Sequence, residues 1–181
     1  MDLRARGRRR LAPAPGVAIA YGLAAGALSG AVGAAAMAAG SKLEQLVTGR
    51  PDSFVPARTL AHLLRLPDRD RDRWTRNMAM HYLAGVTAGS LRGVMSASNL
   101  RGPFASLMHT NLRLTFDQTL ENATGVGAPP WTWPRDELVI DVSHKALYAF
   151  VTGALSDALV APSPSSSARR RGLGRRAKGF A

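Results

Sequence analysis

Apolar residues fill one uninterrupted stretch near the beginning of the chain. The segment from Val17 to Gly40 reads VAIAYGLAAGALSGAVGAAAMAAG and contains no charged side chain. At about 1.5 Å per residue, a helix of this length approaches the roughly 30 Å apolar thickness of a bilayer. A helix in the core of a water-soluble protein is usually shorter and carries one polar face. The pattern therefore predicts a membrane-spanning helix.

Further along, apolar and polar residues alternate at helical spacing, and proline or glycine separates the segments. The spacing predicts a short amphipathic helix at 57–66 and three long helices at 77–98, 104–123 and 135–161. The connection from Ser41 to Arg76 is polar, and we expect it to lie outside the long helices. Its alternating run DRDRDR at 68–73 is typical of a solvated loop or of the beginning of a helix.

Small residues recur at every fourth position in the first two long helices. The two series are Gly22, Gly26 and Gly30, and Gly85, Gly89 and Gly93. Such ridges let two helix backbones approach each other closely within lipid. We therefore expect these two helices to pack against each other.

The formal net charge of +12 is concentrated at the two ends of the chain. Residues 1–10 hold five arginines and one aspartate, whereas residues 163–181 hold five arginines, one lysine and no acid. We expect a basic tail at 1–15, a helical membrane domain at 16–161 and a disordered basic tail at 162–181. Such tails suit anionic lipid headgroups, and no motif for specific nucleic-acid recognition accompanies them.

The basic ends also predict a topology. Four crossings place both ends on one side of the membrane, and Lys and Arg collect on the cytoplasmic side. Trp131 and Trp133 then fall at the opposite membrane surface, where aromatic residues are common. The abundance of Ala, Gly and Arg suggests a bacterial plasma membrane. Two alternatives stay open: a cleaved signal peptide, and a soluble helical bundle with one N-terminal anchor.

Ionisable residues interrupt the apolar pattern of the later helices. His109, Arg113, Asp117 and Glu121 follow one another at intervals of four, so they share one helix face. We expect one buried polar cluster made of His81, Arg92, His109, Arg113, Asp117, Glu121, Asp141, His144 and Lys145. Its members either neutralise one another, as charges within a membrane must, or form a path for protons or ions.

Other kinds of chemistry find less support. A metal site could use His109, Asp117, Glu121 and His144 as ligands, but Arg113 on the same line would repel a cation. The chain has no cysteine, and it lacks the glycine motifs of nucleotide-binding loops and the GxSxG motif of hydrolases. We assign no catalytic residue, no metal and no cofactor.

The arrangement of motifs resembles a known group. A glycine-rich first helix leads into Ser41–Glu44, His81 lies near the start of the second long helix, and a Pro-Trp turn precedes the last one. That helix carries Glu137, Asp141, His144 and Tyr148. Across residues 17–160 this resembles the YagU-like small bacterial inner-membrane proteins. The resemblance implies a multi-span membrane protein of a group without established biochemical activity, linked to acid resistance.

We therefore expect an all-α, four-helix membrane bundle with a short extra amphipathic helix. Its expected function is to support ion or proton homeostasis through the buried cluster. The alternative is a non-catalytic scaffold whose glycine ridges bind another membrane protein or a second copy of the chain.

Overall fold

The computed structural model describes residues 15–67 and 69–160, which form five α-helices and no strand. The helices are α1 (Pro15–Thr48), α2 (Val55–Leu63), α3 (Arg73–Ala97), α4 (Gly102–Ala123) and α5 (Arg135–Leu159). Short 3-10 turns cover Asp70–Asp72 and Pro130–Thr132. The all-helical class is thus confirmed for the described residues. The predicted tails lie outside them, except that Pro15 begins α1.

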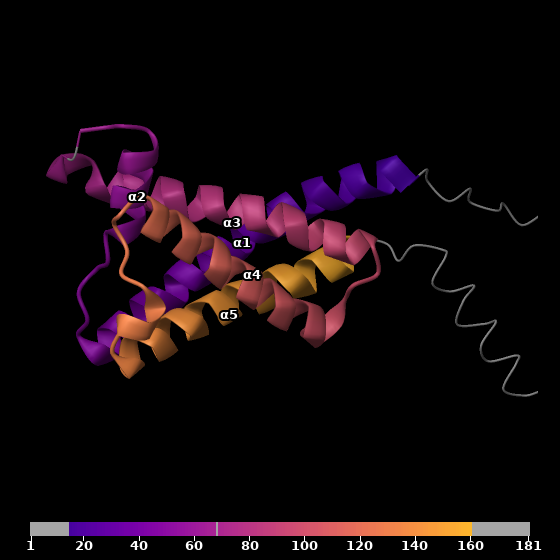
Figure 1. Ribbon diagram of the computed structural model, residues 1–181. Helices are drawn as coiled ribbons and strands as arrows, with labels where there is room; N and C mark the ends of the chain where they lie inside the picture. The colour runs from indigo at the N-terminus through magenta and orange to yellow at the C-terminus, as the bar shows by residue number, and fades with distance from the viewer. Residues whose placement is uncertain (1–14, 68, 161–181) are drawn as a thin grey trace, which may run out of the picture.

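The four long helices run alternately in opposite directions, as Figure 1 shows. α1 packs against α3 and α5, α4 packs against α5, and the short α2 packs against the first part of α3. Both ends of the described chain lie at one end of the bundle, where the Tyr21 hydroxyl donates to the Leu159 carbonyl. We call this the Asp157 end and the opposite end, which carries α2, the α2 end.

The first helix is longer than the hydropathy pattern predicts. The segment Ser41–Thr48 was expected in a polar connection, but it continues α1 through two further turns. That expectation was wrong because the segment contains no glycine or proline and because its charged side chains find partners nearby. α1 ends where Gly49 adopts a positive φ of 71° and donates to the Gln45 carbonyl.

The two glycine series lie directly against each other along the α1–α3 contact. A Cβ atom built on Gly22 would lie 2.8 Å from the Gly93 carbonyl oxygen, and one on Gly30 would lie 2.8 Å from Gly89 Cα. A Cβ on Gly26 would lie 2.7 Å from Gly93 N. Real side chains do not fit at such distances, so the absence of side chains sets the separation of α1 and α3.

Large apolar side chains lie on the outside of the bundle. In the stretches 16–41, 77–97, 103–123 and 138–159, the exposed residues include no Asp, Glu, Lys or Arg. Leu28, Leu83, Phe104 and Val139, one from each long helix, are between 57% and 68% exposed. Each stretch is about 30 Å long or longer at 1.5 Å per residue.

The interior is more polar than this exterior. Its buried apolar residues are mainly alanines and methionines, with one large aromatic residue, Tyr148. Arg92, His109, Arg113 and Lys145 are all at least nine-tenths buried. Apolar and charged residues thus occupy the reverse of their usual positions in a water-soluble protein.

Candidate functional site: a polar cavity at the α2 end

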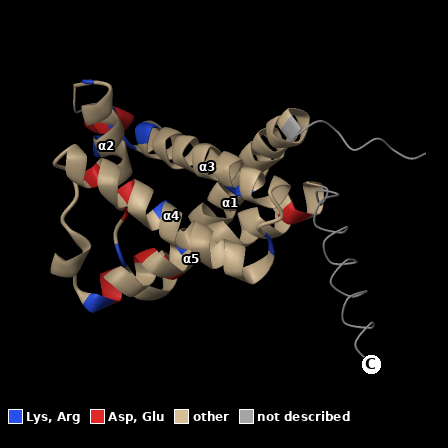
Figure 2. Ribbon diagram, turned by 45° about the vertical axis from the view of Figure 1, so that its right-hand side comes forward, with Lys and Arg blue, Asp and Glu red and all other residues tan. Residues whose placement is uncertain are grey.

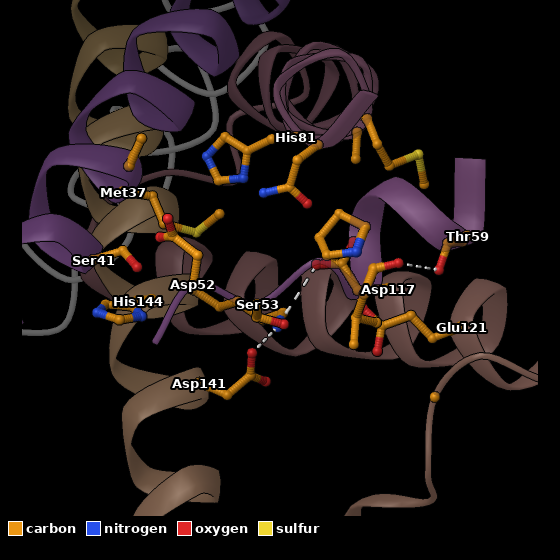
Figure 3. A pocket seen from close by; sticks show the side chains of 18 of the residues that line it. Met37, Ser41, Asp52, Ser53, Thr59, His81, Asp117, Glu121, Asp141 and His144 are labelled. Atoms are coloured by element: carbon orange, nitrogen blue, oxygen red, sulfur yellow. Dashed lines mark hydrogen bonds and ion pairs between the residues drawn. The ribbon is translucent and has the colours of Figure 1, made fainter. Parts of the chain in front are cut away.

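Charged residues are concentrated at the α2 end of the bundle, and a smaller group lies at the Asp157 end (Figure 2). At the α2 end they surround a cavity of about 790 Å³. The cavity is lined by all five helices and by the connections at residues 50–53 and 126–134. Figure 3 shows Asp117 and Glu121 of α4, Asp141 and His144 of α5 and His81 of α3 around this space.

A network of ion pairs forms the inner wall of the cavity. Arg113 Nε donates to both carboxylate oxygens of Asp117 at 3.0 and 2.9 Å. Lys145 Nζ lies 3.7 Å from Asp117 Oδ2 and also donates to Asp141. The Arg113 guanidinium carbon lies 4.8 Å from the centre of the Tyr148 ring. Lys145 therefore connects two carboxylates from different helices, which fixes α5 against α4.

A second set of ion pairs lies at the mouth of the cavity. Lys42 pairs with Asp52, and Arg50 pairs with Glu44 at 3.2 Å and with Glu137 at 2.9 Å. These contacts hold the connection between α1 and α2 across the ends of α1 and α5. The hydrogen bond from Lys42 lowers the pKa of Asp52 below its usual value.

Several polar atoms at the cavity have no partner. Arg113 is only 3% exposed, and its Nη1 is buried without a hydrogen bond to any described residue. Asp141 Oδ2 is also buried without a partner. Among the described residues Glu121 makes no ion pair, and its carboxylate only accepts a long bond of 3.5 Å from Gln118. Buried polar atoms in proteins are normally paired, so such unpaired atoms require a ligand, water or a functional role.

The histidines of the predicted cluster occupy separate places. His81 Nε2 lies 3.0 Å from the Ala34 carbonyl of α1, and His109 Nε2 lies 2.9 Å from the Ala88 carbonyl of α3. A carbonyl only accepts, so Nε2 carries the hydrogen in both rings. His144 lines the cavity on α5. The three rings therefore do not form a single histidine cluster.

Arg92 requires a correction, because it does not join the network at the cavity. It lies at the Asp157 end, where Nη1 and Nη2 donate to the two Asp157 oxygens at 3.1 and 2.9 Å. The Ser96 hydroxyl donates to the same carboxylate at 2.6 Å, and the Gly102 amide donates to it at 2.8 Å. We had not included Asp157 in the cluster. Its place on the inner face of α5, after Thr152 and Ser156, is the signal that points to it.

Between these two groups the inner face of α5 stays polar. Lys145, Tyr148, Thr152 and Ser156 are buried at intervals of three or four residues. The Tyr148 hydroxyl donates to the Gly85 carbonyl at 2.6 Å. Within the described part of the chain, Thr152 Oγ1, Ser156 Oγ and His109 Nδ1 have no hydrogen-bond partner. We call this series of buried polar side chains between the cavity and Asp157 the file; its spacing is visible in the sequence, but we had not predicted it.

The geometry bears on the metal-site alternative as well. In the described part of the chain, no group of three or more His, Asp or Glu residues is arranged to hold a metal ion. His109 instead lies beside Tyr148, with ring centres 5.5 Å apart and ring planes tilted by 44°. The four ligands suggested by the sequence are therefore not brought together.

Comparison with models of protein families, with curated proteins and with solved structures gives no match for this chain. The fold and the cavity accordingly define a class no narrower than an all-helical protein with a charged cavity at one end.

Proposed function

We propose that this chain is an integral membrane protein of four crossings that supports ion or proton homeostasis through its polar interior. The observation that carries the proposal is the inverted distribution of side chains: four helical stretches without exposed charge, at 16–41, 77–97, 103–123 and 138–159, surround buried arginines, a buried histidine and a buried lysine. Lipid favours this arrangement, because charges inside a bilayer turn toward one another or toward water. The resemblance to the YagU-like group is part of the same proposal.

The candidate spans support this proposal in part. Among the described helices, α1 and α5 are long and apolar enough to cross a membrane by length and composition. The core helix of a soluble protein can pass the same test, so a second observation is needed. α3 and α4 supply it: their exposed stretches are free of charge, whereas Arg92, Arg113 and Asp117 on these helices face inward.

The tryptophans favour one orientation. Trp74 and Trp131 are 64% and 85% exposed, and Trp133 lines the cavity, so all three lie at the α2 end. Indole rings settle at the membrane–water interface. The arginine-rich segments of the sequence join the described chain at the Asp157 end. The cytoplasmic side is therefore the Asp157 end, and the cavity opens on the other side of the membrane.

Proton movement is the function that best uses the unpaired interior atoms. Hydroxyls and imidazoles can both donate and accept, and the file from Asp141 through Tyr148, His109 and Thr152 toward Asp157 consists of such groups and carboxylates. Arg113 and Lys145 face this file from α4 and α5, and Arg92 faces it from α3. Each cation is matched by an aspartate, so the file is not a continuous positive barrier.

The test is proton flux in liposomes that contain the purified chain and an internal pH-sensitive dye. The wild type should dissipate an imposed pH gradient faster than empty liposomes, and His109→Gln and Thr152→Val should slow it. Ser143→Ala, on the exposed side of α5, is the matched control and should leave the rate unchanged. Equal rates for wild type and empty liposomes would overturn proton movement.

The scaffold alternative now needs a surface other than the glycine ridges, because these ridges contact each other within the chain. The alternative of a soluble bundle with one anchor is tested by alkaline carbonate extraction. A variant lacking residues 1–40 should remain in the membrane fraction if α3, α4 and α5 span it. Release into the soluble fraction would contradict the four-crossing proposal.

A further inference from the structure

Two buried arginines of the bundle use their guanidinium groups differently. Arg92 presents both terminal nitrogens to Asp157 and is further held by Ser96. Arg113 binds Asp117 only through Nε, and its Nη1 has no partner. The terminal nitrogens of a guanidinium form the fork that matches a carboxylate. Arg113 lines the cavity, and no carboxylate of the described residues pairs with its terminal nitrogens.

An unpaired acceptor lies in the same network. Lys145 Nζ contacts both Asp117 and Asp141. Because Arg113 also pairs with Asp117, Arg113 and Asp141 are linked through Asp117 and Lys145. Asp141 Oδ2 has no hydrogen-bond partner. Two residues of the cavity wall therefore carry unpaired atoms, a donor on a cation and an acceptor on an anion, which are both covered from solvent and belong to one network of ion pairs.

The charges that line the cavity limit what it can hold. Four lining side chains are Lys or Arg: Lys42, Arg50, Arg113 and Lys145. Five are Asp or Glu: Asp52, Asp117, Glu121, Glu137 and Asp141. A simple anion would add to this acidic excess, whereas a molecule with one carboxylate and one ammonium group adds no net charge. A space of about 790 Å³ lies within the usual range of small-molecule sites.

We propose that this cavity binds a small zwitterion of the α-amino acid class. Its carboxylate lies on the terminal nitrogens of Arg113, and its ammonium group lies against Asp141 Oδ2. Glu121, which has no ion pair, is the second acceptor for the ammonium group. This inference deepens the proposed function by naming a solute for the same site. It rests on that function only in one respect, which is the side of the membrane from which the solute enters.

The direct test measures binding to the full chain purified in detergent, so that it does not depend on flux. The standard amino acids are tested singly at millimolar concentration by thermal shift and then by titration calorimetry. At least one amino acid should raise the unfolding temperature. Acetate, ethylammonium and inorganic phosphate, which each lack part of the required chemistry, should not. Equal shifts with acetate or phosphate would overturn the zwitterion assignment.

Matched variants locate the site. Arg113→Lys keeps the charge but removes the fork, and it should weaken binding roughly tenfold or more. Asp141→Asn should weaken it as well. Arg101→Lys is the control, since Arg101 lies at the Asp157 end and donates to the Asp157 and Val160 carbonyls, and it should bind as the wild type does. Arg113→Lys with unchanged affinity would contradict the proposal.

A labelling experiment covers the case in which the Arg113 variant does not fold. The chain contains no cysteine, so Ser41→Cys introduces a single thiol at the cavity wall (Figure 3). The bound amino acid should slow the reaction of this thiol with a small maleimide, and ethylammonium should not. Absence of any protection would overturn the site. Binding without proton flux would contradict the proposed function alone, and flux without binding would contradict this inference alone.

Discussion

Each end of the bundle contains a buried guanidinium group, and its terminal nitrogens are paired differently at the two ends. At the Asp157 end, the Arg92 side chain is fully buried and its carboxylate partner also accepts from Ser96 and from the Gly102 amide. At the α2 end, Arg113 pairs with Asp117 through Nε at the wall of the cavity, and its Nη1 has no partner among the described residues. The difference concerns the terminal guanidinium nitrogens: both are paired in Arg92, where only Nε lacks a partner among the described residues, whereas Nη1 of Arg113 is unpaired.

The difference shows how a structural charge is told apart from one available for function. A buried ion pair stabilises a protein only when its remaining donors and acceptors are also satisfied. Both oxygens of Asp157 and both terminal nitrogens of Arg92 are satisfied, and only Arg92 Nε is unpaired; the pair ties α5 to α3 and to the beginning of α4. The network of Arg113, Asp117 and Lys145 leaves Arg113 Nη1 unpaired, so part of its hydrogen-bonding capacity remains for water or a solute.

The largest effect is expected at the Asp157 end. Asp157→Ala leaves the fully buried Arg92 without its counter-charge and removes an acceptor from the Gly102 amide. Loss of one partner of a buried pair costs about 3–5 kcal/mol. Thermal or denaturant unfolding in detergent should show this loss. The double variant Arg92→Met, Asp157→Leu removes both charges and should recover most of it. A double variant no more stable than Asp157→Ala would contradict this account.

At the cavity end the corresponding change should cost less. Asp117→Asn removes one carboxylate from Arg113 and Lys145, but Lys145 keeps Asp141 and the cavity lets water reach the site. A hydrogen bond to a charged group contributes about 1.5–3 kcal/mol, so the loss should fall in that range. The same unfolding measurement applies. A loss as large as that of Asp157→Ala would show that the two ends are equivalent after all.

The α1–α3 contact between the two glycine series allows a comparison that involves no ion pair. A Cβ on Gly89 would lie 2.5 Å from Gly30 Cα and 2.8 Å from Gly30 N. Backbone cannot move aside as a side chain does, so Gly89→Ala should cost about 1–3 kcal/mol by overpacking. Gly16→Ala is the control, because nothing lies within 4 Å of that position, and it should be neutral or slightly stabilising. Equal stability of the two variants would mean that the ridge contact is unimportant.

The sequence predicted these regions unequally. Helical spacing and the glycine series were sufficient for the long helices, because both depend on local periodicity. The mouth of the cavity was not predictable, since Lys42, Arg50 and Asp52 lie in a segment that reads as a polar connection, and only the extra turns of α1 bring them to the cavity. Arg92 was assigned to the wrong group because spacing shows which face of a helix a residue occupies, not which of two distant acids it meets.

The smallest effect is expected at the mouth of the cavity, where Lys42 and Asp52 are both exposed. Exposed ion pairs contribute less than about 1 kcal/mol and are screened by salt. Lys42 lowers the pKa of Asp52 in the folded protein. The contribution of this pair is therefore present above the unfolded pKa of about 3.9 and is lost as the pH falls through the lower, folded value. Lys42→Gln should lower stability slightly at neutral pH and low salt, and the difference from wild type should vanish in strong acid or in high salt. A difference that grew under either condition would contradict the assignment of this contribution to the ion pair.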